Sequence, residues 1–327
     1  MQRLAGILMV FLMAGVAQAA SFDCRKASSK MERAICTNPR LSVLDESLAT
    51  AYMAAKARLS SNSVKTFVTG QSSWLRFTST YCFTDYNAAA ASPEEADKCL
   101  AEAYRQRIKE IEATGKIVAG FKTYLMLDTT IKVSAKEQAV HTLERRYVQL
   151  DDNSALAVKL NSYLTLKNKI DFDADARGSE SYSVNLSNPS KDWMYKELTA
   201  DTSTGAYPNT YKECGVYAIS LGRPLLIRDV FAGQEWIKIA EAAARRHFAA
   251  LAKQNSEFTL DMVMGYERFQ VKPDQAFPYC FTAIGMYVDG FFPHVAQVFD
   301  GVTIPWQTFD RVLTPYARQQ IRTISGK

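Results

Sequence analysis

The sequence has few of the residues on which common enzyme classes depend. It holds 3 His among 327 residues, and it has neither a G-x-G-x-x-G nor a P-loop sequence. Because those glycine-rich loops hold the phosphates of nucleotides, we expect no nucleotide cofactor, and we predict no cofactor at all. The formal net charge is only +5, from 39 Lys and Arg against 34 Asp and Glu. A nucleic-acid partner would require a clustered basic face, so we expect none.

Long hydrophobic runs are also scarce. The one candidate is Leu4–Val16, which is shorter than the roughly 20 residues that a membrane span needs. Arg3 precedes this run, and Ala17-Gln18-Ala19 follows it in the small-x-small pattern of a cleavage site. We therefore predict that residues 1–20 are a signal peptide. The mature protein is then periplasmic or secreted, with no membrane contact after cleavage.

No two cysteines have the C-x-x-C spacing of a zinc or redox site. In an exported chain, an even number of cysteines favours disulfides over metal binding or thiol catalysis. The six are Cys24, Cys36, Cys82, Cys99, Cys214 and Cys280. Sequence alone leaves three connectivities open for the first four. We favour Cys24–Cys36 and Cys82–Cys99, and Cys214–Cys280 then follows by exclusion.

Residues 21–115 have the pattern of a helical domain. Ser29-Lys30-Met31-Glu32 fits a capping box, and Ser92-Pro93-Glu94-Glu95 repeats the same signals. Asn38-Pro39 supplies a cap and a first-turn proline for another helix. Apolar residues recur every three or four positions between these caps, and Gly115 is suited to end the last helix. We predict a small helical bundle pinned by two disulfides.

Residues 116–327 have a mixed pattern that predicts an α+β domain. Short alternating runs at Ser181–Leu186, Cys214–Leu221 and Phe281–Val288 indicate strands. Helical periodicity appears near Ser154–Leu164 and from Gln234 to Gln254. The predicted fold class is therefore α followed by α+β. The second domain would be an antiparallel sheet packed with helices on one face, and the boundary lies near residue 115.

Catalytic and metal-binding motifs fail when they are tested one by one. Gly70–Trp74 lacks the second glycine of a nucleophile elbow and lies in a helical pattern. His141 and Glu144 have the spacing of two metal ligands on a helix, but no third ligand is evident. Asp171–Asp175 opens like a calcium loop, yet Tyr182 stands where the loop requires Glu. We predict a protein that is not an enzyme and binds no metal.

The first domain resembles the LprI-type lysozyme inhibitor family over about 90 residues. The segments that carry the resemblance are Phe22–Cys24, Met31–Cys36, Leu41–Tyr52, Gln71 with Trp74-Leu75, and Cys99–Ile108. One departure is Thr80-Tyr81 before the third Cys, where Arg-Asp is common in the family. The resemblance implies a secreted helical domain, associated in some members with inhibition of lysozyme. Gln71 and Trp74 are candidate binding residues, although a Trp on an apolar helical stripe is more often core.

Residues 125–315 resemble, with scattered identities, the extracellular domain of the anti-sigma factor RsiV and related deacetylase-associated modules. The clearest segments are Gly205–Asn209, Leu221–Leu225 and Gly301–Trp306. In the first of them, Tyr207 replaces the His of the family turn. RsiV-type domains are known for binding lysozyme, so this resemblance implies the same partner as the first one does.

We therefore predict an exported, non-enzymatic protein that binds lysozyme-type muramidases and inhibits them. The candidate binding residues are Tyr207 and Asn209 in one turn, and Phe291, Phe292 and His294 in an aromatic segment. An ordinary turn or strand end is the simpler explanation of each. Alternative functions are a peptidoglycan- or glycan-binding envelope module and a cell-wall hydrolase. The small positive charge argues against a basic partner such as lysozyme, because electrostatic steering favours opposite charges.

Overall fold

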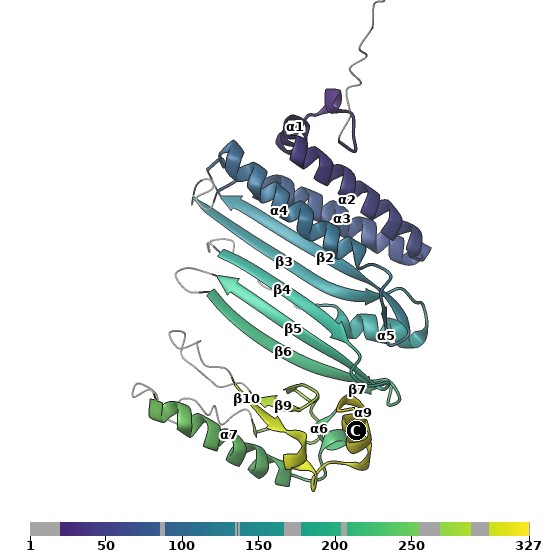
Figure 1. Ribbon diagram of the computed structural model, residues 1–327, viewed down its shortest axis with the longest axis vertical. Helices are drawn as coiled ribbons and strands as arrows, with labels where there is room; N and C mark the ends of the chain where they lie inside the picture. Colours follow the sequence, from purple (N-terminus) through teal and green to yellow (C-terminus); the bar gives the residue numbers. More distant parts are fainter. Residues whose placement is uncertain are drawn as a thin grey trace, which may run out of the picture.

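The computed structural model describes residues 20–85, 89–134, 136, 138–166, 178–203, 208–254, 269–288 and 301–326. The predicted signal peptide lies almost wholly outside this part of the chain. The N-terminal region forms helices α1 (Lys30–Thr37), α2 (Pro39–Arg58), α3 (Ser61–Tyr81) and α4 (Pro93–Glu112). Helices α2, α3 and α4 lie side by side along one edge of a large sheet (Figure 1).

The helices begin where the sequence predicted them to begin. The capping box at Ser29 and Glu32 is formed, and so is the one at Ser92 and Glu95. Asn38 caps α2, whose first residue is a proline. These caps satisfy N–H groups that would otherwise have no partner at the helix starts. None of the helices in the described ranges is both long and apolar enough to cross a membrane.

The main sheet has seven strands, and their order in the sheet follows their order in the chain. They are β1 (Ile117–Val118), β2 (Phe121–Ser134), β3 (Ala139–Leu150), β4 (Gly178–Ser187), β5 (Trp193–Ser203), β6 (Pro208–Ala218) and β7 (Arg223–Pro224). All neighbours are antiparallel except β3 and β4, which are parallel and are connected through helix α5 (Ala155–Leu164). The predicted fold class is confirmed.

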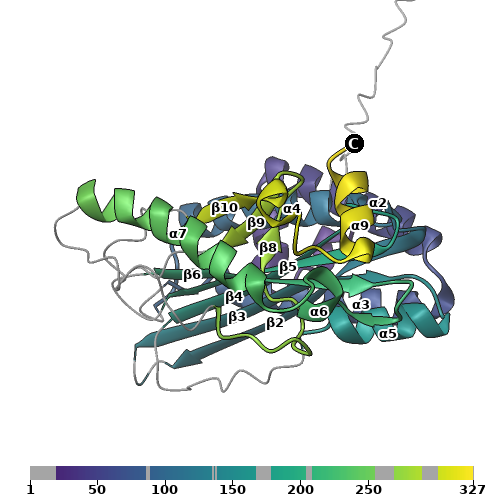
Figure 2. The same ribbon diagram turned by 90° about the horizontal axis from the view of Figure 1, so that it is seen from below.

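Both faces of the sheet are covered, whereas the sequence analysis expected helices on one face. Trp193 and Val216 belong to one hydrophobic cluster, and Met194 and Tyr217 belong to another. Because successive residues of a strand point to opposite faces, the two clusters lie on opposite sides of the sheet. Helix α5 packs in the second cluster, and Figure 2 shows it across the sheet from α9 and the small sheet.

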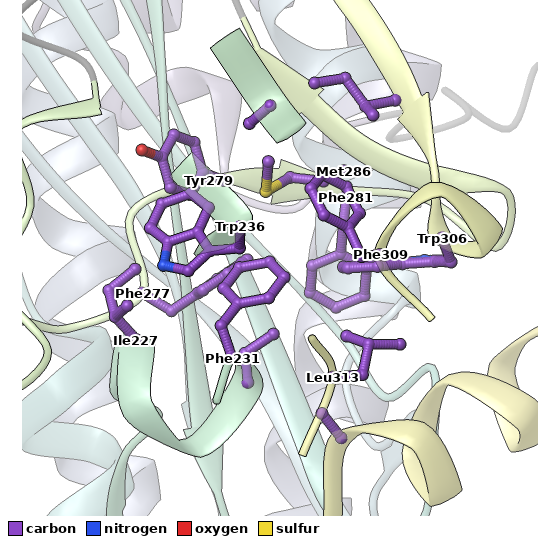
Figure 3. Packing of buried hydrophobic residues seen from close by; sticks show 14 of the residues in the cluster. Ile227, Phe231, Trp236, Phe277, Tyr279, Phe281, Met286, Trp306, Phe309 and Leu313 are labelled. Carbon is purple, nitrogen blue, oxygen red and sulfur yellow. The ribbon is translucent and has the colours of Figure 1, made fainter. Parts of the chain in front are cut away.

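The first of these clusters is built by the C-terminal elements. They are α6 (Ile227–Val230), α7 (Glu235–Gln254), β8 (Cys280–Phe281), β9 (Gly285–Val288), β10 (Val302–Pro305), the 3-10 helix η4 (Trp306–Phe309) and α9 (Pro315–Ile324). Strands β8 to β10 form a separate three-stranded sheet. Figure 3 shows the aromatic centre of this cluster, where the rings of Phe231 and Trp236 stack at 4.5 Å.

Helix α3 covers the edge of strand β2. The hydroxyl of Ser73 accepts a hydrogen bond from the Thr129 N–H and donates one to the Thr129 carbonyl, both at 3.2 Å. A Cβ on Gly70 would lie 3.2 Å from the carbonyl oxygen of Leu127, so a glycine allows the close approach. The segment that failed as a nucleophile elbow therefore shields a strand edge, which would otherwise expose unpaired backbone groups.

Three disulfides join the cysteines: Cys24–Cys36, Cys82–Cys99 and Cys214–Cys280. They are the pairs that the sequence analysis favoured. The first two lie within the helical region, and the third joins β6 of the main sheet to β8 of the small sheet. Since disulfides persist in oxidising compartments, the three bridges fit an extracytoplasmic protein.

The capping box of α1 leads us to predict how the stability of the fold depends on pH. The Glu32 carboxylate accepts hydrogen bonds from the backbone N–H groups of Ser29 and Ser28, both at 2.8 Å, and these bonds lower the pKa of Glu32 to about 2. A lowered pKa stabilises the fold above the ordinary value of 4.5, and this stabilisation is lost as the pH falls towards 2. We expect Glu32→Ala to cost about 0.5–1 kcal/mol near neutral pH, a small value because water screens this exposed site.

Denaturant unfolding of the wild type and the variant, from neutral pH to below pH 4, measures this difference. The difference should shrink as the solution becomes acidic. Glu46→Ala is the control, because Glu46 is an exposed residue of α2 outside any cap. A difference for Glu32→Ala that stays constant down to about pH 2 would contradict the argument.

Candidate functional site

A cavity of about 360 Å³ lies between the helical region and the main sheet. We call it the α3–α4 hollow. From the helical region it is lined by Tyr81, Cys82, Thr84, Asp85, Ala91, Glu95 and Cys99, and from the sheet by Val140, Thr142, Gly178, Ser179 and Ser203. The lining therefore combines two carboxylates with several hydroxyl groups.

The helical wall of the hollow is held in place by covalent and backbone bonds. The Cys82–Cys99 disulfide ties the residue after α3 to the second turn of α4. Between these cysteines, Thr84 and Ala90 form an antiparallel bridge, and the Asp85 N–H donates to the Ala89 carbonyl at 2.9 Å. The carboxylate of Asp85 in turn accepts from the Ala89 N–H at 2.7 Å. These bonds fix the position of the Asp85 carboxylate at the hollow.

The segment around the hollow is strongly acidic. Residues 82–103 carry one basic residue, Lys98, and five acidic residues: Asp85, Glu94, Glu95, Asp97 and Glu102. The Ser92 hydroxyl and the Ser92 backbone N–H donate to the Glu95 carboxylate, and they hold the pKa of Glu95 below its usual range. Glu95 is therefore ionised at neutral pH. Its Oε2 atom accepts both hydrogen bonds from Ser92.

Chemically, the hollow is suited to a cation that also donates hydrogen bonds. Carboxylates accept from lysine or arginine side chains, and these charge-assisted bonds are about twice as strong as neutral ones. The hydroxyls of Thr142, Ser179 and Ser203 add donors and acceptors on the opposite wall. A projecting basic side chain of a partner protein matches both walls.

Sequence reasoning missed the α3–α4 hollow for two reasons. Charge was compared over all of residues 21–115, where basic residues upstream of the acidic segment cancel its charge. A window of about 20 residues reveals the acidic segment directly. The sheet wall, in contrast, comes from strands β3, β4 and β5, two of which had no strand signal that the sequence analysis recognised.

Of the five binding residues in the turn and the aromatic segment, only Asn209 lies in the described chain. Tyr207, Phe291, Phe292 and His294 lie outside the described residues. Asn209 is in strand β6, where its backbone pairs with Thr202 of β5. A binding role for these five residues stays a prediction.

Gln71 and Trp74 are both buried in the helical region. Gln71 accepts a hydrogen bond from the Nε of Arg107 at 2.9 Å, and the Trp74 ring meets the Tyr104 ring edge-on at 5.2 Å. Both side chains therefore help to hold the helices together, which is the simpler of the two roles considered from the sequence.

The metal-ligand pair considered at His141 and Glu144 does not form. Both residues lie in strand β3 and not in a helix, so a spacing of three places their side chains on opposite faces. His141 lies 3.5 Å from the Glu180 carboxylate, whereas Glu144 pairs with Arg146. Among the described residues, no group of three His, Cys, Asp or Glu side chains is placed to hold a metal. The acidic run Asp171–Asp175 is outside the described residues.

Comparison with known proteins gives one family match, and it covers the helical region. Residues 24–111 match the family model described as lysozyme inhibitor LprI. This match confirms the LprI-type resemblance for that segment, which is less than half of the chain. No curated protein matches the sequence.

Two solved structures are similar to the larger part of the chain. One is a DUF3298 family protein from Pseudomonas aeruginosa PAO1, with 16% identity and a TM-score of 0.44, covering 60% of this chain and 96% of that one. The other is a DUF3298 family member from Bacteroides fragilis NCTC 9343, with 11% identity and a TM-score of 0.37, covering 62% and 98%. The RsiV-like character of residues 125–315 stays a prediction.

Proposed function

We propose that this protein is a non-enzymatic, exported protein that binds lysozyme-type muramidases and inhibits them, acting in the periplasm or outside the cell. The observation that carries the proposal is the LprI match over residues 24–111, since that family is described as a lysozyme inhibitor. The three disulfides support export. We further propose that residues 21–115 and 116–327 act as two domains, with the first supplying the inhibitor surface.

Within that surface, we propose the α3–α4 hollow as the contact with the muramidase. Lysozymes are strongly basic, and the net charge of the whole chain disfavoured such a partner. The acidic segment around Asp85 and Glu94 removes this objection, because steering depends on the local field at the contact surface. The partner would insert a lysine or arginine side chain between Asp85 and the hydroxyls of the sheet wall.

A binding experiment with two matched variants tests this proposal. Asp85→Asn with Glu94→Lys raises the charge beside the hollow by three units and keeps a hydrogen-bond acceptor at position 85. The control, Asp274→Asn with Glu46→Lys, makes the same charge change at exposed positions elsewhere. Calorimetric titration with a c-type lysozyme at low ionic strength should show binding about tenfold weaker for the hollow variant, and nearly unchanged for the control.

The outcomes separate the parts of the proposal. Equal losses in both variants would show that the hollow is not the contact. No binding of the wild type at tens of micromolar would reject lysozyme as the partner. Clearing of a peptidoglycan suspension by lysozyme, measured with increasing protein, distinguishes an inhibitor from a protein that only binds. Sedimentation with purified peptidoglycan tests the alternative of a glycan-binding module.

A further inference from the structure

A large cavity lies at the opposite end of the molecule from the helical region. It has a volume of about 1090 Å³ and is bounded by the β8–β9 turn, β10, η4 and α9. These elements are at the far side of the main sheet from α2, α3 and α4 (Figure 1). We call this cavity the arginine groove, for the reason given below.

The floor of the arginine groove is apolar. Trp306, Leu313 and Ile321 line it, and each is buried. The indole Nε1 of Trp306 donates to the Thr282 carbonyl at 3.1 Å, so the polar atom of this ring is already bonded within the protein. Figure 3 shows Trp306 and Leu313 at the border of the aromatic core. A ligand on this floor would therefore meet mainly carbon atoms.

The rim of the groove is cationic. Arg311, Arg318 and Arg322 all line it, with Asp310 as the one acidic residue. Arg318 and Arg322 are four residues apart on α9, which places them on the same side of the helix. None of the three forms an ion pair with a carboxylate in the described part of the chain.

One of the arginines is fixed in position before any ligand arrives. The Nη2 of Arg318 donates to the backbone carbonyls of Asp310 at 2.7 Å and Leu313 at 3.4 Å. Among the described residues, the Nε and Nη1 atoms of Arg318 make no such bond to a backbone carbonyl. At the other end of α9, the Ser325 hydroxyl donates to the Ala283 carbonyl at 2.9 Å and joins the helix to the β8–β9 turn. The two walls of the groove are thus held at a set separation.

Local helix stability explains only part of this arrangement. A basic residue in the last turn of a helix is favoured by the helix dipole, and this accounts for Arg322. It does not account for Arg311, which precedes the helix, or for Arg318. Ile284 in the β8–β9 turn also lies at the groove with 71% of its surface exposed, so its apolar side chain is open to a ligand there.

We propose that the arginine groove binds a phosphate-bearing amphiphile, with the phosphate at the three guanidinium groups and the apolar chain along the floor towards Ile284. Guanidinium groups match phosphate oxygens in a bidentate geometry. A phosphate monoester offers three terminal oxygens and close to two negative charges, which suits three arginines better than the two oxygens of a carboxylate do. The phosphate monoester can belong to a phosphatidic acid in a membrane or to a free amphiphile.

Titration with two soluble probes tests the chemistry of the groove. Dodecyl phosphate, below its micelle concentration, should bind the purified protein at least about tenfold more tightly than inorganic phosphate, because only the amphiphile uses the floor. Arg311→Gln with Arg322→Gln should weaken dodecyl phosphate binding by about tenfold or more. Both side chains are exposed and make no hydrogen bond within the part of the chain that the structure describes, so this variant should fold normally.

The control variant is Arg40→Gln with Arg76→Gln, which removes the same charge from exposed positions of α2 and α3. It should bind dodecyl phosphate as the wild type does. Equal affinity for inorganic phosphate and dodecyl phosphate would contradict the proposal that the ligand is an amphiphile. Unchanged binding of dodecyl phosphate in the Arg311 and Arg322 variant would contradict the proposal that it binds in the arginine groove. Because no muramidase is present, the result does not depend on the proposed function.

Vesicle sedimentation then identifies the source of the phosphate. Sedimentation with vesicles that contain phosphatidic acid, whose headgroup is a phosphate monoester, supports a membrane phospholipid if it is lost in the Arg311 and Arg322 variant. Binding of dodecyl phosphate without sedimentation supports a free amphiphile. Sedimentation that persists in the variant would show that the vesicles contact another surface, and would overturn a membrane role for the groove.

Discussion

Replacing Glu110 by Gln is expected to lower the free energy of unfolding by about 3–5 kcal/mol. Glu110 is the centre of a charge network between α4 and β3. Its carboxylate lies 3.2 Å from Nη1 of Arg107 and 3.2 Å from Nε of Arg146, and Arg146 also bonds Glu144 at 2.6 Å. The side chains of Arg107 and Glu110 are only 1% and 8% exposed.

The large effect follows from what the substitution leaves behind. Without the carboxylate, the buried Arg107 loses its ion pair, and the half-buried Arg146 keeps only its bond to Glu144. The charge of Arg146 also disfavours the charge of Arg107. Burial already lowers the pKa of the Arg107 guanidinium, and its Nη2 already lacks a hydrogen-bond partner. Removing one member of a buried ion pair therefore costs far more than the pair contributes when intact.

Helix α4 supplies the matched control. Glu102 and Arg105 form an ion pair at 3.3 Å with the same spacing of three residues, but the Glu102 side chain is 81% exposed. Glu102→Gln should change stability by less than about 1 kcal/mol. Urea unfolding of both variants, followed by circular dichroism, measures the two values. Similar losses of unfolding free energy for Glu110→Gln and Glu102→Gln would show that burial does not determine how much the network contributes to stability.

The second large effect is expected from the Cys214–Cys280 disulfide. Replacing both cysteines with alanine should cost about 4 kcal/mol, because this bridge closes a long loop and so restricts the unfolded chain strongly. Its sequence separation is 66 residues, against 12 for Cys24–Cys36. The same relation gives about 3 kcal/mol for the shorter bridge, so Cys24→Ala with Cys36→Ala is the control.

The position of the Cys214–Cys280 bridge in the fold leads to a second expected difference between the two double variants. The long bridge joins β6 to β8, and the small sheet that contains β8 forms a wall of the arginine groove. We therefore expect its loss to weaken dodecyl phosphate binding as well, whereas loss of the Cys24–Cys36 bridge should leave that binding intact. Thermal unfolding of both double variants measures the stabilities. A larger loss for the short bridge would contradict the loop-length argument.

The sequence predicted the helical region well because its signals are local. A cap such as Asn38-Pro39 or Ser92-Pro93 acts on amide groups within the next three residues, so its meaning does not depend on the rest of the chain. The helices at Ser154–Leu164 and Gln234–Gln254 were also found, since each has its own apolar stripe. The division near residue 115 stays a prediction, and the core of the helical region includes Tyr124 and Leu127 of β2.

Strands β2, β3 and β5 were missed because they are buried on two sides and lack strict alternation. Strand β2, for example, has Tyr124 and Leu127 in the core of the helical region, on an edge that α3 covers. In β3, Glu144 and Arg146 belong to the network with Glu110. The spacing of His141 and Glu144 suggested a helical metal site instead. Burial of this kind depends on partners distant in sequence, and periodicity does not record it.

The sequence by itself determined the caps and stripes of the helices, the even set of six cysteines and the family resemblance of the first region. All of these depend on residues close together in the chain, or on a spacing that folding does not change. Tertiary structure alone decided which polar and charged groups from different elements come together. It placed the sheet hydroxyls opposite Asp85, centred a buried network on Glu110, and brought Arg311, Arg318 and Arg322 around an apolar floor. Such groupings depend on distances through space, which a linear pattern does not contain.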